Sequence, residues 1–172
     1  LDYVETPTYS YLWTAEMDSA ELASGTDKDF NFTTPDVSPE EGMKTVTVTL
    51  LVTDGYGCIA LTTQCLSVYA IPTCGIGGPD SVCEESPVKE FYYSGEDPTT
   101  ATFEFAWSVD GKKVGTGEPI DIDWTPFTFG DHVLTLVVDK TYEGGKKVSS
   151  TCEHAVKYVP SPDSSIVLVG VV

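Results

Sequence analysis

The chain has 172 residues and a strongly acidic balance, with 27 aspartates and glutamates, nine lysines, no arginine and a formal net charge of −18. A surface of that sign repels phosphate backbones, and it lacks the side chain that binds phosphate best, so we expect no nucleic-acid partner. The sequence contains no run of about 20 apolar residues, the length that a membrane-spanning helix needs. We therefore expect no membrane span within the chain.

The first predicted element is a β-strand over residues 9–15, because its apolar side chains stand at alternate positions: Tyr9, Tyr11, Trp13 and Ala15. A period of two is typical of a strand with one buried face. Residues 15–24 have a composition that helices tolerate, but they lie where the second half of the chain has a tight hairpin. We predict a loop or one short turn there.

The next predicted strand covers residues 45–53, where threonines alternate with Val46, Val48, Leu50 and Val52. Threonine favours strands through its branched Cβ. The turn Asp54-Gly55-Tyr56-Gly57 then reverses the chain, and a further strand starts near Cys58. The glycine-rich residues 72–79 predict a short joint.

The second half of the chain repeats the landmarks of the first in the same order. The matched pairs are Trp13 with Trp107, Gly25 with Gly115, Phe30 with Ile120, Leu50 with Leu136, Cys65 with Cys152 and Pro72 with Pro160. In the second half, Asp110-Gly111 predicts a type I′ hairpin turn. We therefore predict an all-β chain of two homologous modules, residues 1–72 and 73–160, each an immunoglobulin-like sandwich with one core tryptophan, Trp13 or Trp107.

The Tyr-x-Tyr-x-Trp and Phe-x-Phe-x-Trp strands, with Thr47-Val48-Thr49-Leu50-Leu51-Val52-Thr53-Asp54 before a glycine turn, resemble the polycystic-kidney-disease (PKD) type of immunoglobulin-like module. The resemblance spans nearly the whole chain. It implies an extracellular protein, because such modules are common in surface proteins of archaea and bacteria as spacers and as adhesive or structural units. The usual Gly-Asp-Gly after the tryptophan strand is absent, and the nearest residues are Val109-Asp110-Gly111.

The repeat also predicts an asymmetry between the two ends. The second module has a first strand near residues 80–84, but Leu1-Asp2-Tyr3-Val4 correspond to a second strand, so we expect the first module to lack its first strand. Residues 161–172 form an apolar tail at the position of a further first strand. We expect this tail to complete the first module of a neighbouring copy and to build a head-to-tail polymer. The predicted donor residues are Ile166, Val167, Leu168, Val169 and Val171.

Two alternatives remain for the tail. It continues into a third module of a longer array, or it begins a membrane anchor.

The five cysteines, Cys58, Cys65, Cys74, Cys83 and Cys152, form no CxxC pair, and disulfides are expected rather than a metal site. We predict a Cys83–Cys152 bridge, because a first strand neighbours the last strand in such sandwiches. Cys74 is an alternative partner for Cys58 or Cys65. Because five is odd, at least one thiol is free or joins another chain.

No catalytic motif surrounds His132 or His154, and we expect no enzyme activity and no cofactor. Asp121 and Asp123 are weak calcium candidates without a loop signature, and Cys152 with His154 is a weak metal pair. Asn31 begins the sequon Asn31-Phe32-Thr33.

We predict a structural subunit of an extracellular surface layer, sheath or filament. The alternative is an adhesive or carbohydrate-binding spacer module of a larger secreted protein, with Tyr92 or Phe127 on the binding face.

Overall fold

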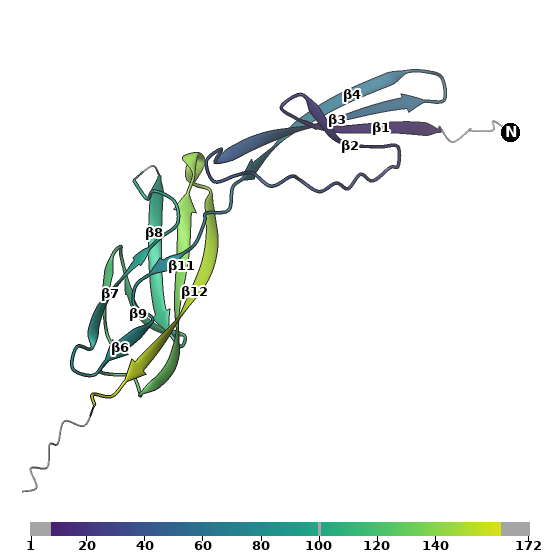
Figure 1. The fold of residues 1–172 in the computed structure, drawn as a ribbon. Helices are drawn as coiled ribbons and strands as arrows, with labels where there is room; N and C mark the ends of the chain where they lie inside the picture. Colours follow the sequence, from purple (N-terminus) through teal and green to yellow (C-terminus); the bar gives the residue numbers. More distant parts are fainter. Residues whose placement is uncertain (1–7, 100, 163–172) are drawn as a thin grey trace, which may run out of the picture. The chain divides into compact units, whose positions relative to one another are not determined.

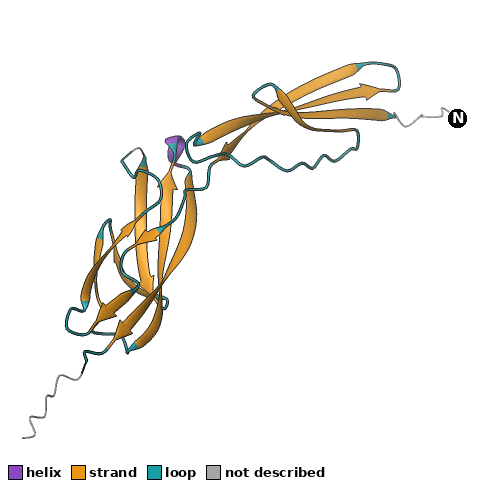
Figure 2. Cartoon of the chain, in the orientation of Figure 1, coloured by secondary structure: helices purple, strands orange, loops and turns teal. Residues whose placement is uncertain are grey.

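The computed structural model describes residues 8–99 and 101–162, and in this part the chain is all-β apart from one 3-10 turn, Glu143–Gly145 (Figures 1 and 2). The contacts divide the chain into two compact units between Ile71 and Pro72, called unit 1 and unit 2 below. No helix among these residues is both long enough and apolar enough to cross a membrane.

Unit 1 contains one four-stranded antiparallel sheet in the order β2-β1-β3-β4. The strands are β1 (Tyr9–Met17), β2 (Ala20–Gly25), β3 (Met43–Asp54) and β4 (Ile59–Tyr69). The loop predicted over residues 15–24 is wrong. Asp18 and Ser19 both have positive φ, 52° and 66°, and they close a tight hairpin between β1 and β2.

Unit 2 contains two sheets that share one core. The strands are β5 (Ile76–Gly77), β6 (Ser81–Cys83), β7 (Val88–Tyr93), β8 (Thr102–Val109), β9 (Lys112–Thr116), β10 (Ile120–Asp123), β11 (Gly130–Thr141) and β12 (Lys147–Val159). The sheet orders are β6-β12-β11-β8-β9 and β10-β7-β5. The predicted type I′ turn is confirmed, because Asp110 and Gly111 have φ values of 47° and 77°.

The core of unit 2 contains side chains from both sheets, including Phe91 of β7 and Trp107 of β8. In unit 1, by contrast, the buried apolar residues among those described are only Ala15, Val37, Val46 and Ala70. Trp107 is 1% exposed, whereas Trp13 is half-buried. The predicted sandwich is therefore complete in unit 2, while unit 1 shows a single sheet within the described residues.

The two units repeat the same tryptophan–glycine arrangement. Trp13 pairs with Gly25, and Trp107 pairs with Gly115. A Cβ on Gly25 would lie 2.9 Å from the Phe30 ring, and one on Gly115 would lie 2.5 Å from Ile120 Cδ1. At both positions an apolar side chain packs directly on the glycine backbone, and a Cβ there would force that side chain to shift.

The strand pairing in the last hairpin of each unit, β3–β4 and β11–β12, corrects one of the matched pairs. Leu50 pairs with Thr62 in unit 1, and Leu136 pairs with Cys152 in unit 2. Thr62 is therefore the structural equivalent of Cys152, whereas Cys65 pairs with Thr47 and points to the other face of the sheet. The match of Cys65 with Cys152 is wrong.

The predicted Cys83–Cys152 bridge is also wrong. Cys152 forms a disulfide with Cys74, with the two Cα atoms 5.6 Å apart. Cys83 does lie on a strand beside β12, as predicted, but it pairs with Val159. Seven extended residues separate Val159 from Cys152, or about 23 Å, beyond the reach of a disulfide.

Candidate functional site

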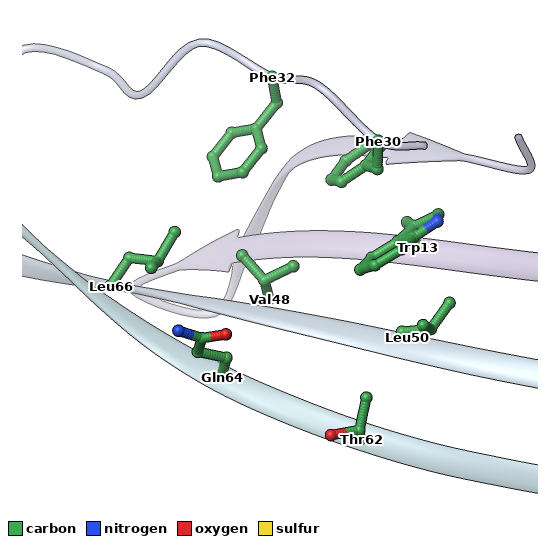
Figure 3. Close-up of a pocket in the computed structure, with 8 residues that line it drawn as sticks. All are labelled: Trp13, Phe30, Phe32, Val48, Leu50, Thr62, Gln64 and Leu66. Atoms are coloured by element: carbon green, nitrogen blue, oxygen red, sulfur yellow. The ribbon is translucent and has the colours of Figure 1, made fainter. Parts of the chain in front are cut away.

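An apolar groove of about 300 Å³ lies on the inner face of the unit 1 sheet (Figure 3). Strand β1 contributes one lining residue, β3 two and β4 three, and two more come from the coil that follows β2. The lining residues are Trp13, Phe30, Phe32, Val48, Leu50, Thr62, Gln64 and Leu66. None of these side chains is ionisable, so the groove suits an uncharged, apolar occupant.

Three stacked aromatic rings form one wall of the groove. The ring centroids of Trp13 and Phe30 are 5.6 Å apart, and those of Phe30 and Phe32 are 5.5 Å apart. The indole Nε1 of Trp13 donates a hydrogen bond to the carbonyl oxygen of Asp27 at 3.1 Å. The coil after β2 is therefore held over the sheet, and the aromatic wall is built from local contacts within unit 1.

The opposite wall, formed by β4, is exposed. Its three lining residues are Thr62, Gln64 and Leu66, which alternate along the strand and face the same way. Leu66 is 37% exposed. Complete burial of a fully exposed aliphatic side chain is worth about 1.5 to 3 kcal/mol, and a contact with another segment would add the share that belongs to the exposed part of Leu66.

Unit 2 shows what covers the equivalent wall. The structural equivalents of Thr62, Gln64 and Leu66 are Cys152, His154 and Val156. Cys152 is bonded to Cys74, His154 Nε2 lies 3.4 Å from the Pro79 carbonyl oxygen, and Val156 is 2% exposed. The segment that contains Cys74 and Pro79 precedes β6, and it therefore lies along β12 at the position where β4 is exposed in unit 1.

A ring from the second sheet also covers that wall in unit 2. Phe91 of β7 is fully buried, and its ring centroid lies 6.2 Å from that of His154. In unit 1, the residues described include no strand at the position of β7. The groove is thus bounded by the stacked aromatic wall on one side and by exposed β4 on the other.

Several predicted site residues lie outside the part of the chain that the structure describes. These are the donor residues Ile166, Val167, Leu168, Val169 and Val171, and Leu1-Asp2-Tyr3-Val4 at the other end. The acceptor groove lies within the described part. Asn31 is exposed between the half-buried Phe30 and Phe32.

The candidate metal ligands do not form a cluster. Asp121 and Asp123 lie on the exposed face of β10, and in residues 8–99 and 101–162 no three His, Cys, Asp or Glu side chains gather as a metal site would require. The sulfur of Cys152 is in a disulfide and is not available as a thiolate ligand. His154 instead lies 3.3 Å from Asp80.

The two aromatic residues considered for carbohydrate binding occupy different environments. Tyr92 is 47% exposed on β7. Phe127 packs against the rings of Trp124 and His132, with centroid distances of 5.5 and 5.8 Å. They do not form a shared aromatic platform.

Trp124 is a core residue that the sequence analysis missed. It is fully buried in unit 2, and its Nε1 has no hydrogen-bond partner among the described residues. The sequence does contain a pattern that indicates its burial, because Ile120, Ile122 and Trp124 stand at alternate positions. The expectation of one inward tryptophan per module is wrong for unit 2.

Three cysteines are exposed free thiols: Cys58, Cys65 and Cys83. Cys58 and Cys65 belong to unit 1, and Cys83 ends β6 of unit 2. Together with the Cys74–Cys152 disulfide, they account for all five cysteines.

Comparisons with known proteins give structural matches only. No family model matches the chain, and neither does the sequence of any curated protein. The fibronectin(III)-like modules of Clostridium thermocellum CbhA match with 13% identity and a TM-score of 0.38, over 92% of this chain and 83% of that one. Human mucin-like protocadherin EC1-2 matches with 13% identity and a TM-score of 0.30, over 91% and 86%. Protocadherin gammaB7 EC3-6 matches with 11% identity and a TM-score of 0.29, over 89% and 41%.

Proposed function

We propose that the chain is a non-catalytic structural subunit of an extracellular assembly such as a surface layer, sheath or filament. In this proposal it consists of two immunoglobulin-like, PKD-like modules, and the first lacks its own first strand. Residues 164–172 of one copy complete unit 1 of the next copy. The observation that carries the proposal is the apolar groove between Trp13 and exposed β4, at a position that unit 2 covers with its own chain.

The tail has the composition that this groove requires. Residues 166–172 are Ile-Val-Leu-Val-Gly-Val-Val, without a charge or a proline. Such a segment has a high β propensity, and a free apolar strand promotes aggregation unless it is paired. The uncharged lining of the groove matches it chemically.

Side-chain burial alone does not decide whether the tail binds to the groove. Burial of Ile166 and Leu168 contributes roughly 1.5 to 3 kcal/mol for each side chain, while ordering the tail costs roughly 1 to 2 kcal/mol per residue. These terms are of similar size, so main-chain hydrogen bonds to β4 have to supply the net stabilisation.

The contact joins different surfaces of the two copies. A head-to-tail contact of this kind repeats, and it generates filaments or closed rings. The exposed thiols of Cys58, Cys65 and Cys83 offer a covalent reinforcement between copies. An oxidising environment outside the cell would allow it, and it would also preserve the Cys74–Cys152 disulfide.

Light scattering coupled to size-exclusion chromatography tests the proposal. The full chain should increase in mass as its concentration rises, whereas a chain that ends at residue 163 should remain monomeric. The same polymer size for both chains would refute assembly through the tail.

A further inference from the structure

We propose that the donated strand adds to the outer edge of β4 in parallel orientation, with Ile166 opposite Thr62 and Leu168 opposite Gln64. This inference rests on the proposed assembly, and it specifies the orientation and register of the contact. It is drawn from unit 2, where the same chain already contains a short strand on the equivalent edge.

The template is the pairing of β6 with β12, the one parallel pair among the described strands. Ser81 pairs with Lys157, and Val82 pairs with Tyr158. The Lys157 amide donates to the carbonyl oxygen of Asp80 at 2.9 Å, and the Glu84 amide donates to the carbonyl oxygen of Val159 at 3.0 Å. This edge of β12 is thus built to accept a parallel strand.

The equivalent edge of unit 1 follows from the register. Thr62 and Cys152 are equivalent and differ by 90 in number (152 − 62), so Ser67 corresponds to Lys157 and Val68 to Tyr158. β4 is the last strand of its sheet within the described residues. An edge strand that lacks a neighbour on one side presents its backbone to an incoming strand.

The register of the tail follows from the repeat between the modules. The last strands β4 and β12 match with an offset of 90, and the same offset relates Val82 to Val172. Because Val82 pairs with Tyr158, Val172 would pair with Val68. Earlier along the same parallel strands, Leu168 lies opposite Gln64, and Ile166 lies opposite Thr62.

This register directs the large side chains of the tail into the groove. Thr62 and Gln64 both line the groove, and paired residues of neighbouring strands point to the same face. In unit 2 the positions of Ile166 and Leu168 are held by Ile76 and Gly78, and a Cβ on Gly78 would lie 2.4 Å from the Phe91 ring. The tail thus offers one additional large aliphatic side chain, Leu168, to the emptier of the two units.

Cysteine cross-linking tests the orientation. Thr62→Cys is introduced into a chain in which Cys58, Cys65 and Cys83 are replaced by serine, so that the Cys74–Cys152 disulfide is retained. This chain is mixed with a second chain of the same background that carries either Ile166→Cys or Val172→Cys. Parallel addition predicts that the mixture with Ile166→Cys forms the interchain disulfide at least tenfold faster on a non-reducing gel.

A faster reaction with Val172→Cys, or equal rates, would overturn the parallel register. If neither pair reacts although removal of residues 164–172 still abolishes polymers, the position on β4 is wrong while the assembly itself stands. If removal of the tail leaves polymers unchanged, the assembly proposal fails as well. A third chain that carries both Thr62→Cys and Ile166→Cys detects self-insertion, since a fast disulfide within one chain would contradict exchange between copies.

Discussion

The imidazole of His132 donates from Nδ1 to the carboxylate of Asp110, with the nitrogen 2.6 Å from Oδ2. Its other ring nitrogen, Nε2, lies 2.7 Å from the carbonyl oxygen of Thr128, which only accepts hydrogen bonds. Both ring nitrogens therefore face hydrogen-bond acceptors, and the imidazolium form can donate to both of them. It joins the start of β11 to the turn between β8 and β9.

This contact predicts a pH-dependent stability of unit 2. Burial lowers the pKa of His132, but the hydrogen bonds from the ring to Asp110 and to the Thr128 carbonyl raise it more, so the pKa lies above 6.5. The hydrogen bond from His132 is the main reason that the pKa of Asp110 lies below 3.8. The stabilisation is therefore complete between pH 3.8 and 6.5, and it is lost as the pH rises through the folded-state pKa of His132.

We expect a loss of about 1 kcal/mol between pH 6 and pH 9, since the half-exposed Asp110 carboxylate is screened by solvent. Urea unfolding followed by the indole NMR signal of Trp124 measures it. The pH dependence should disappear in His132→Gln and persist in the matched variant His154→Gln. An unchanged slope in His132→Gln would contradict the assignment.

A buried ion pair predicts a second effect. Lys140 is 5% exposed, and its ammonium group pairs with Glu96 and lies over the rings of Phe103 and Tyr142. Glu96→Gln would leave the buried ammonium without its carboxylate and lower the free energy of unfolding by about 3 kcal/mol. Glu104→Gln removes the exposed partner of Lys147 and should lower the free energy of unfolding far less, because solvent screens that pair. Equal losses in the two variants, measured by urea unfolding, would show that burial is not decisive.

The disulfide gives a third prediction. Cys74 and Cys152 are 78 residues apart, and in the chain-entropy model a bridge of that span contributes about 4.5 kcal/mol. The double variant Cys74→Ala, Cys152→Ala should therefore melt well below the parent in calorimetry. Cys83→Ser should melt with the parent. A large shift for Cys83→Ser would instead support the bridge that the sequence suggested.

Salt should promote assembly. Each copy carries a formal net charge of −18, so neighbouring copies repel one another, and added salt screens that repulsion. The mean polymer mass in sedimentation velocity should rise between about 10 and 150 mM sodium chloride, as the Debye length falls from about 30 to 8 Å. A mass that falls with salt would indicate that ion pairs hold the copies together.

The sequence predicted those features that depend on local patterns. Alternating side chains located β1, β3 and β8, and Asp110-Gly111 located a hairpin, because side-chain period and turn chemistry are properties of short segments. The same logic could have found Trp124, which continues the alternation of Ile120 and Ile122. The hairpin at Asp18 and Ser19 was missed because neither residue is a glycine.

The predictions that the structure contradicts depend on the register between strands. A shift by an odd number of residues moves a side chain to the opposite face of the sheet. The repeat matched Cys65 with Cys152, three residues away from Thr62, the residue that the strand pairing matches with Cys152. The Cys74–Cys152 bridge was missed for a similar reason, because it depends on where the segment before β6 passes β12. The groove of unit 1 could be anticipated only as an open edge, because its aromatic wall depends on how the coil with Phe30 and Phe32 folds back.

Complementation between two disabled chains tests strand donation most directly. A chain that ends at residue 163 retains only the groove, and a full chain with Leu66→Glu retains only the tail. Light scattering should find monomers of each chain alone and dimers in the equimolar mixture, without larger polymers. A full chain with Leu61→Glu, altered on the opposite face of β4, is the matched control and should still polymerise. Monomers in the mixture, or polymers of the Leu66→Glu chain alone, would contradict the account.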